Sequence, residues 1–427
     1  MPASATPVHL SVPHRPVLDG VPFAVRATLL AASMMTVMAG AAVAAALPLI
    51  KDAFAAHEDR ELLAKLVLSL PALAIACFAP VSGWVADRFG RKRLLTGGLV
   101  LYVIAGTSGL YLEEPYPILA GRLLLGVAVA MVITASTTLV SDYFSGPARA
   151  TFMGRQAMFM SLGGVLFIPL GELLSFVGWH APFAIYILGL PVLALAIKHI
   201  REPDRTTAPE PTADAPAVRT PWATVVLLCG IAFASMLAFY LGPVQVPFHW
   251  REVFGVRQGV GLVLAAMTLA GAITASQYGR IARNASAPWL IALMFLAVGI
   301  GYSVIGHTAR PEVAFAGLTL AGFGAGLMMP TLSTWMMRVA PPHLRGRLSG
   351  VLMSALFLGQ SLSPKMIALL KDDGGNTWVF AAVGGALVAL AACFAATLLL
   401  RKLRRPLELR GGCGHNRHEP TLRGSSP

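Results

Sequence analysis

The sequence has 427 residues, of which 56% are hydrophobic and only 12% are charged, and its mean hydropathy is +0.69. So few charges could not cover the surface of a soluble protein of this size. The long uninterrupted apolar runs also lack the alternation of a transmembrane β-barrel. The net charge of +13 comes from basic residues in short loops and tails, a pattern typical of membrane proteins rather than of nucleic-acid binding. We therefore predict an all-α polytopic membrane protein.

Twelve apolar runs follow one another along the chain, each long enough to cross a bilayer as a helix of about 20 residues. They occupy residues 25–50, 62–85, 93–112, 118–141, 155–177, 181–200, 222–247, 257–281, 287–306, 311–337, 346–370 and 376–400. A stretch rich in Pro, Ala, Thr and Asp divides them six and six and is typical of a flexible linker. The predicted divisions are a disordered cytoplasmic tail (1–24), a first bundle (25–200), the linker (201–221), a second bundle (222–400) and a basic disordered tail (401–427).

The distribution of Lys and Arg predicts the orientation of these helices. With both termini in the cytoplasm, 24 Lys and Arg fall in cytoplasmic segments and 7 fall outside. Because short cytoplasmic loops are enriched in positive charge, this orientation is predicted. The first run is too long for the core of a signal peptide, which indicates a retained first helix. The four cysteines show neither metal-ligand spacing nor a disulfide framework, so no metal site and no cofactor are predicted.

The two halves of the chain repeat. The block Arg149-x4-Gly154-x8-Gly163 recurs as Arg345-x4-Gly350-x8-Gly359, offset by 196 residues. Pro169 and Pro364 follow these blocks, with the register slipped by one. Six helices plus six with a central linker predict two pseudo-symmetric six-helix bundles around a site near the middle of the membrane.

On these features the chain resembles the major facilitator superfamily of secondary transporters. The residues that carry the resemblance are Gly83, Asp87, Arg88, Gly90, Arg91 and Lys92 in the loop between spans two and three; Ala46-Leu47-Pro48 with Ile50; Leu119-x2-Arg122-x3-Gly126, followed by Asp142 and Arg149; and Gly178-Trp179-His180 with Phe183. Within the family the pattern is most similar to bacterial drug:proton antiporters and related small-molecule exporters, which implies a location in the inner (plasma) membrane of a bacterium.

The resemblance implies that the loop after span two is a gate. Asp87 would face the positive N-terminal end of span eleven, and Arg91 would pair with Asp142, so that the halves are latched in the outward-open state. Gly83 and Gly90 would permit close packing and a tight turn, and Arg88 is expected to set the topology. Alternatively these charges only orient the loop. In the second half Arg283 replaces the equivalent aspartate, so that copy of the latch is degraded.

Arg122 and Glu172 are the candidate proton-coupling residues. Each lies inside an apolar run, a few residues from its outer end, and ionisable residues in such places are usually paired and functional. We hypothesise that they interact or share a proton site. The alternatives are a snorkelling arginine and a glutamate bonded to helix ends. Glu172 replaces a glycine of the antiporter signature in span five, and this departure weakens the resemblance to proton antiporters.

Candidate cavity residues come from spans one, four, seven and ten, which line the transport route in the family. They are Met35, Thr36, Met131, Thr134, Thr138, Phe239, Tyr240, Gln245, Met328, Thr331 and Trp335. Methionine and aromatic side chains suit a pliable site that accepts apolar compounds. The alternative for each of them is ordinary packing between helices.

These features predict a secondary active transporter that exports a small, partly apolar compound in exchange for protons by alternating access. A drug or a secreted metabolite such as a siderophore would fit. An importer or facilitator is the first alternative, and a non-transporting membrane sensor or scaffold is the second. The chain has no Gly-rich phosphate loop and no catalytic constellation, so neither ATP-driven transport nor an enzyme is predicted. The expected partners are the substrate, protons and the lipid bilayer, without nucleic acid, and the protein is expected to be a monomer.

Overall fold

The computed structural model of the chain describes residues 21–202, 221–256, 258–341, 344–371 and 375–411. Within these ranges the chain forms helices joined by turns, and twelve helical stretches are long and apolar enough to cross a membrane. The predicted all-α fold with twelve spans is therefore confirmed. Most of the predicted tails and linker, at 1–20, 203–220 and 412–427, lies outside the described residues.

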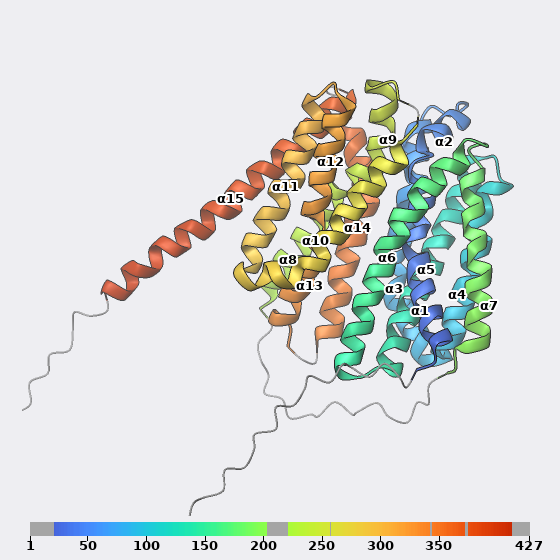
Figure 1. Ribbon diagram of the computed structural model, residues 1–427, viewed down its shortest axis with the longest axis horizontal. Coiled ribbons are helices and arrows are strands. Elements are labelled where there is room, and N and C mark those ends of the chain that lie inside the picture. The colour runs from blue at the N-terminus through green and yellow to red at the C-terminus, as the bar shows by residue number, and fades with distance from the viewer. Residues whose placement is uncertain (1–20, 203–220, 257, 342–343, 372–374, 412–427) are drawn as a thin grey trace, which may run out of the picture.

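Each half of the chain forms its own bundle, and the two bundles stand side by side (Figure 1). The first contains α1 (Phe23–Ala44), α2 (Leu47–Ala53), α3 (Arg60–Phe89), α4 (Arg91–Gly106), η1 (Thr107–Leu110), α5 (Pro115–Tyr143), α6 (Gly146–Ser175), η2 (Ala181–Leu188) and α7 (Gly189–His199). The second contains α8 (Trp222–Phe239), α9 (Leu241–Val253), α10 (Val260–Asn284), α11 (Ala287–His307), α12 (Pro311–Ala325), α13 (Met328–Val339), α14 (Arg345–Lys371) and α15 (Gly375–Gly411).

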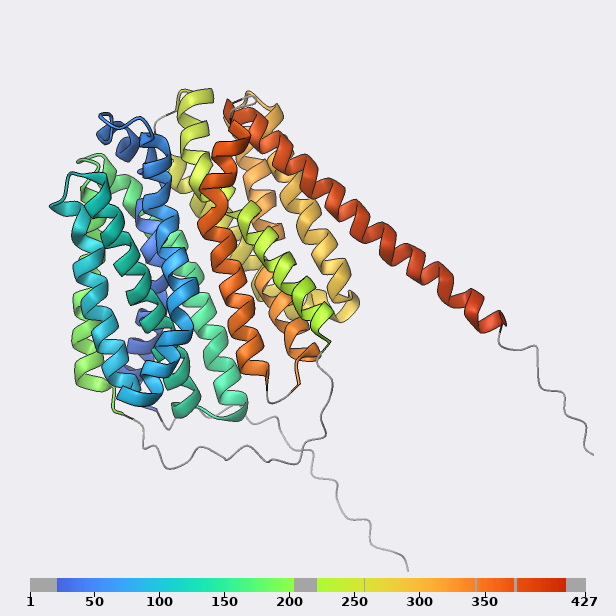
Figure 2. The same ribbon diagram turned by 180° about the vertical axis from the view of Figure 1, so that it is seen from behind.

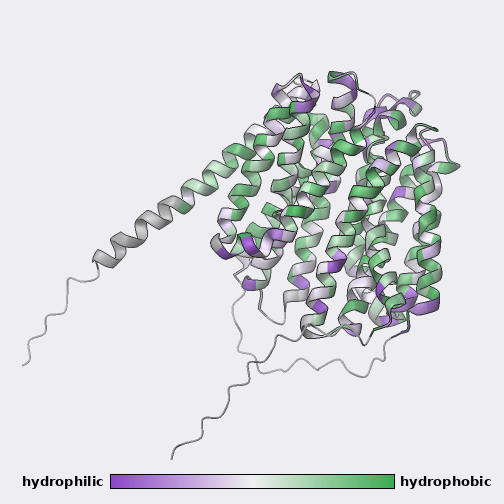
Figure 3. Cartoon of the chain, in the orientation of Figure 1, coloured by the Kyte–Doolittle hydropathy of each residue, from purple (hydrophilic) through white to green (hydrophobic). Residues whose placement is uncertain are grey.

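The molecule has two ends, named here by the chain. The proximal end is where α1 begins, α7 ends and α8 begins, and the distal end is opposite. Figure 3 shows hydrophilic residues mainly toward the two ends and hydrophobic residues along the helices between them. This distribution matches a bundle whose middle lies in the hydrocarbon of a bilayer.

The last helix corrects one predicted boundary. A disordered tail was expected from residue 401, but α15 continues as a helix to Gly411 and leans away from the bundle (Figure 2). Apart from Pro406, the segment 401–410 consists of Leu, Arg, Lys and Glu, which are strong helix formers and favour continuation of the helix beyond the apolar run.

Three predicted spans are broken in the structure. A turn at Ala45–Ala46 separates α1 from α2, Tyr240 separates α8 from α9, and Gly326–Leu327 separates α12 from α13. The first two breaks lie at corresponding positions of the repeated halves. Pro48 lies in the first turn of α2, where its missing N–H removes no helical hydrogen bond. Broken helices of this kind surround the binding site in many transporters built from repeats.

Two helix pairs join the halves, α3 with α14 and α6 with α10. Under the repeat α3 corresponds to α10 and α6 to α14, so the two pairs are related to each other by the pseudo-symmetry. A Cβ on Gly261 of α10 would lie 2.8 Å from an oxygen of Glu172 and 3.0 Å from Cα of Pro169. Glycine therefore permits α6 and α10 to approach closely near the distal end.

Candidate functional site

The loop between α3 and α4 at the proximal end is held within the first half. The predicted ion pair between Arg91 and Asp142 is present, but both residues belong to the first half, so the latch between the halves that was expected of it remains a prediction. The carboxylate of Glu202 accepts hydrogen bonds from the backbone N–H groups of Arg91 (2.6 Å) and Lys92 (2.9 Å), and so caps the first turn of α4. Gly90 adopts φ +100°, and a Cβ there would lie 2.9 Å from the Glu202 carboxyl carbon. Glycine is needed at this position for both reasons.

The other predicted gate residues have mixed outcomes. The side chain of Asp87 lies outside the described part of the structure, so its contact with span eleven remains a prediction. Gly83 was expected to permit close packing, but a Cβ there would meet no heavy atom within 4 Å. That expectation is wrong in this conformation, because Gly83 lies inside α3 and away from the turn. The Arg88 guanidinium is 5.7 Å from the ring centroid of Trp84.

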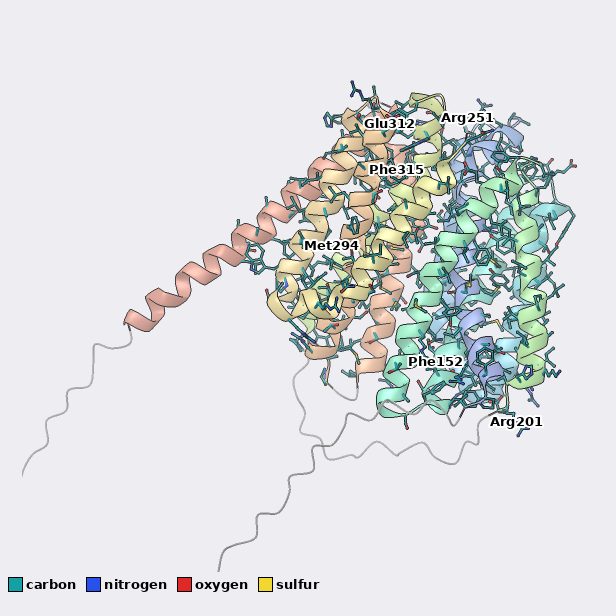
Figure 4. All side chains as sticks on the ribbon, in the orientation of Figure 1. Phe152, Arg201, Arg251, Met294, Glu312 and Phe315 are labelled. Carbon is teal, nitrogen blue, oxygen red and sulfur yellow. The ribbon has the colours of Figure 1, made fainter. Side chains whose placement is uncertain are left out.

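Glu202 was missed as a functional residue by sequence reasoning. It lies just after α7, in the segment Arg201-Glu202-Pro203 that follows span six. The same segment is bound to the end of α5, since the hydroxyl of Tyr143 donates to the Arg201 carbonyl at 2.5 Å. Arg201 lies at the proximal end in Figure 4. A glutamate directly after a span, with a basic loop elsewhere on the same face, was the available signal.

Arg122 is fully buried in the first half, with 0% exposure. Its Nε donates to the Val67 carbonyl of α3 (2.8 Å), one terminal nitrogen donates to the Tyr186 hydroxyl (2.9 Å), and the other donates to the Ala39 carbonyl of α1 (2.7 Å). Its guanidinium also lies 5.7 Å from the ring centroid of Phe183. One side chain of α5 therefore ties together α1, α3 and η2. This excludes the snorkelling alternative for Arg122.

A proline explains why α3 can bind Arg122. Pro71 lies inside α3 and has no N–H to donate to the carbonyl four residues earlier, which is that of Val67. The freed carbonyl accepts the Arg122 hydrogen bond. Pro80 likewise leaves the Ala76 carbonyl free, and the Ser354 hydroxyl of α14 donates to it at 3.3 Å across the two halves.

In each bundle a tyrosine joins the third membrane span to the first. Tyr102 of α4 donates to the Met35 carbonyl of α1 at 2.7 Å. Tyr302 of α11 donates to the Phe239 carbonyl of α8 at 2.8 Å, where Pro243 has removed the helical donor. The two hydrogen bonds join corresponding helices, but not at the residues that the offset of 196 relates, since that offset maps Tyr102 onto Val298.

Glu172 is not paired with Arg122. Its two carboxylate oxygens accept hydrogen bonds from the backbone N–H groups of Val260 and Gly261, each at 2.9 Å. These are the first residues of α10, where the helix dipole favours a negative charge. The hypothesis of a direct Arg122–Glu172 interaction is therefore wrong for this structure, because the two side chains point from their helices to different partners. Glu172 instead links the two halves near the distal end.

The distal end carries a cluster of charges that sequence reasoning missed. Glu61 of α3 accepts hydrogen bonds from Lys51 (3.0 Å), Lys65 (2.7 Å) and Lys371 (2.7 Å), and Lys371 belongs to α14 of the other half. Lys51 also lies 3.4 Å from Glu252 of α9. Lys65 is 2% exposed, and a lysine buried inside an apolar run was the signal that could have found this cluster.

Further contacts surround this cluster. Asn376 of α15 donates to Glu252 and accepts from Gln245. Arg251 of α9 pairs with Asp52 at 2.6 Å and donates to the Pro48 carbonyl at 3.3 Å. Figure 4 shows Arg251 at the distal end, beside the first half. Ion pairs, a helix cap and amide hydrogen bonds thus close the distal end between the halves. We call these residues the distal gate: Lys51, Asp52, Glu61, Lys65, Glu172, Gln245, Arg251, Glu252, Lys371 and Asn376.

The predicted cavity residues do not share one surface. Met131 packs on α4, since a Cβ on Gly98 would lie 2.9 Å from its Cβ. Phe239 and Met328 line a small void inside the second bundle. Tyr240 is buried and reaches the first half, because a Cβ on Gly40 would lie 3.3 Å from its hydroxyl oxygen. The packing alternative is therefore supported for Met131, Phe239 and Met328.

The polar members of that set differ in their hydrogen-bond partners. Thr36 donates to the Ser33 carbonyl at 2.7 Å and Thr138 donates to the Thr134 carbonyl at 2.8 Å. Thr331 is 1% exposed, and its hydroxyl has no hydrogen-bond partner among the described residues. Trp335 is half-buried. Gln245 is fully buried and belongs to the distal gate.

Comparison with known proteins identifies the family. The family model "Major Facilitator Superfamily" matches residues 29–364. This chain belongs to the major facilitator superfamily. Its members are non-enzymatic carriers, so the protein is a multi-pass membrane transporter and not an enzyme.

Several curated members of the superfamily are similar over most of their length. The 2-nitroimidazole transporter of Escherichia coli (strain K12) is 26% identical over 350 residues, which are 76% of this chain and 83% of that protein. The class C tetracycline resistance protein of Escherichia coli is 27% identical, over 73% of this chain and 81% of that protein. The bacillibactin exporter of Bacillus subtilis (strain 168) is 25% identical, over 72% of this chain and 80% of that protein.

Solved structures agree on the fold. The D-xylose-proton symporter aligns with a TM-score of 0.71 at 14% sequence identity, over 87% of this chain and 97% of that one. The human organic anion transporter MFSD10 aligns with a TM-score of 0.66 at 19% identity, over 87% and 99%. At these identities the likeness concerns the arrangement of the helices alone.

Proposed function

We propose that this transporter exports a small, partly apolar compound in exchange for protons, with Glu172 as the residue that takes up and releases the proton. The observation that carries the proposal is the position of the Glu172 carboxylate, which crosses from α6 to the N-terminus of α10 in the other half. The proposal also draws on the relatives, among which a tetracycline resistance protein and a bacillibactin exporter match over most of their length.

The charge distribution supports an orientation in which the proximal end faces the cytoplasm, since the basic loop containing Arg91 lies there. The distal gate then closes the outer side. In an alternating-access cycle this conformation would accept substrate from the cytoplasm, and opening of the distal gate would release it outside.

In this proposal, the hydrogen bonds between the Glu172 carboxylate and α10 couple protonation of Glu172 to the opening of the distal gate. An ionised carboxylate accepts from both N–H groups of α10, whereas a protonated one has an O–H that faces an N–H donor. In the proposed cycle, a proton taken up from outside in the open state would have to leave Glu172 toward the cytoplasm as the gate closes, so that one proton enters in each return step.

The direction of transport is tested in inverted membrane vesicles that contain the full-length protein. We expect a pH gradient, acid inside, to drive accumulation of a fluorescent apolar cation or of a catecholate siderophore, and an uncoupler to abolish it. Vesicles of the opposite orientation serve as the control. Accumulation only in right-side-out vesicles would show an importer. Failure to transport any compound, together with a protein partner that binds the chain, would favour a sensor.

Lys371→Gln is expected to shift the protein toward the state with an open distal gate. Glu61 would keep Lys51 and Lys65 in its own half but lose the ammonium at 2.7 Å that comes from the other half. Both side chains are partly exposed, at 27% and 22%, so the ion pair should stabilise the closed distal gate by only about 1 kcal/mol. Its loss should change the ratio of open to closed molecules roughly fivefold. Spin labels at the exposed positions Glu58 and Arg310 would report the distance between the distal ends.

The matched control for this variant is Lys198→Gln, which removes an exposed lysine at the proximal end. It should leave the distance distribution unchanged. If Lys371→Gln also leaves the distribution unchanged, the ion pair does not hold the gate closed.

A further inference from the structure

A groove of about 610 Å³ opens on the second half between α14 and α15, toward the distal end. Leu362 and Met366 of α14 form one wall, Ala382 and Ala386 of α15 form the other, and α8 contributes the floor. Figure 2 shows α8 between these two helices. All of the described residues that line the groove are apolar except Lys365.

The groove exists because α15 packs on α11 rather than on α14. A Cβ on Gly384 of α15 would lie 2.5 Å from the Ser303 nitrogen, and a Cβ on Gly306 of α11 would lie 2.5 Å from the Ala381 nitrogen. These glycines bring the two backbones into direct contact. Since α14 packs chiefly on α8 and α3, α14 and α15 separate and leave the apolar face of α8 uncovered.

Lys365 is an unusual residue for such a groove. It is exposed, and no hydrogen bond or ion pair to it is found among the described residues. It precedes the end of α14 at Lys371 by six residues, which is roughly 9 Å along the helix axis. An ammonium group beside hydrocarbon is stable when it reaches the headgroup region or meets an anion.

We propose that this groove binds an anionic phospholipid, with an acyl chain between α14 and α15 and the phosphate beside Lys365. The apolar walls suit the chain, the lysine suits the phosphate, and the volume lies within the range of about 300–1,000 Å³ typical of ligand sites. This site goes beyond the proposed transport function and does not depend on it.

The first half provides an internal comparison. In the register that aligns Pro169 with Pro364, the position of Lys365 corresponds to Leu170. The corresponding helix of the first half, α6, therefore has leucine at this position, and only the second half has the lysine. Lys365→Leu is accordingly a substitution that the fold is expected to tolerate.

The proposal is tested by native mass spectrometry of the purified full-length protein after titration with phosphatidylglycerol or phosphatidylethanolamine. The wild type should retain phosphatidylglycerol preferentially. Lys365→Leu should lower that preference about fivefold, the effect of one basic residue at an anionic lipid surface. Lys198→Leu, which removes an exposed lysine at the proximal end, should keep the preference.

A second variant tests the acyl-chain part of the site with Lys365 intact. Ala386→Trp would fill the groove from α15, where Ala386 is exposed, and should weaken retention of phosphatidylglycerol. Equal retention of the two lipids by the wild type would overturn the proposal, as would an unchanged preference in Lys365→Leu. Loss of binding in Lys365→Leu with none in Ala386→Trp would overturn the assignment of the acyl chain to the groove.

Discussion

Arg122→Ala is expected to abolish transport and to lower the thermal stability of the protein strongly. The variant removes the donor of the Val67 carbonyl in a place with no exposure to solvent, whereas the Ala39 carbonyl keeps the hydrogen bond from the Tyr186 hydroxyl. Each unsatisfied buried polar group costs about 1–3 kcal/mol. The Val67 carbonyl has no second donor from its own helix, because Pro71 occupies the position that would supply one.

Arg122→Lys separates the charge from the geometry of the guanidinium. Lysine keeps the positive charge, but it has no planar fork that could reach α1, α3 and η2 together. We therefore expect transport to fall more than about tenfold, with a smaller loss of stability than in Arg122→Ala. Transport in proteoliposomes and unfolding in detergent would be measured on the same preparations.

The control for the arginine series is Arg93→Lys, at an exposed position next to the loop between α3 and α4. A surface change of this kind should alter stability by less than about 0.5 kcal/mol. Tyr186→Phe should reproduce part of the Arg122 effect, since it removes the hydroxyl that contacts both Arg122 and the Ala39 carbonyl. Full transport by Arg122→Lys would contradict the role of the three-way contact.

Glu172→Gln is expected to remove the response of transport to a pH gradient while exchange of substrate across the membrane continues. The amide is close in shape to the carboxylate, but it cannot gain or lose a proton near neutral pH. It also presents an N–H₂ group to one of the two N–H donors of α10. We expect gradient-driven accumulation to fall at least about tenfold, measured beside substrate counterflow without a gradient.

Glu312→Gln is the matched control, because Glu312 is an exposed carboxylate at the distal end of the second half (Figure 4). It should leave both activities intact. Undiminished gradient-driven transport by Glu172→Gln would rule out Glu172 as the proton-coupling residue. Loss of both gradient-driven transport and counterflow would show that the link between α6 and α10 is needed for the conformational change itself.

The candidate site was predictable in part from individual residues. Arg122 stands out because a cation inside an apolar run must find partners, and the structure confirms that it is buried and donates a hydrogen bond from each of its three side-chain nitrogens. The pairing of Arg91 with Asp142 was also predicted and is present. The partners of Glu172 were not predicted. Every non-proline residue has a backbone N–H group, so the sequence does not show which of these groups the carboxylate will bind.

The contacts of the distal gate could not be predicted from the sequence either. Lys51, Glu61 and Lys371 lie near the ends of three different spans, where charged residues are expected at a membrane surface. For these three residues the sequence does not distinguish a charge that faces water from one that faces another helix, since this depends on how the bundles rotate and tilt against each other.

The sequence by itself determined the membrane location, the twelve spans and the two repeated halves, because hydropathy and residue spacing act locally along the chain. It also singled out Arg122, since the free energy of burying a charge is a property of the residue and its span. Only the tertiary structure decided that Glu172 caps α10, that Glu61 binds lysines from both halves and that α15 leaves a groove beside Lys365. These contacts join residues far apart in the chain, and their geometry follows from the packing of whole helices.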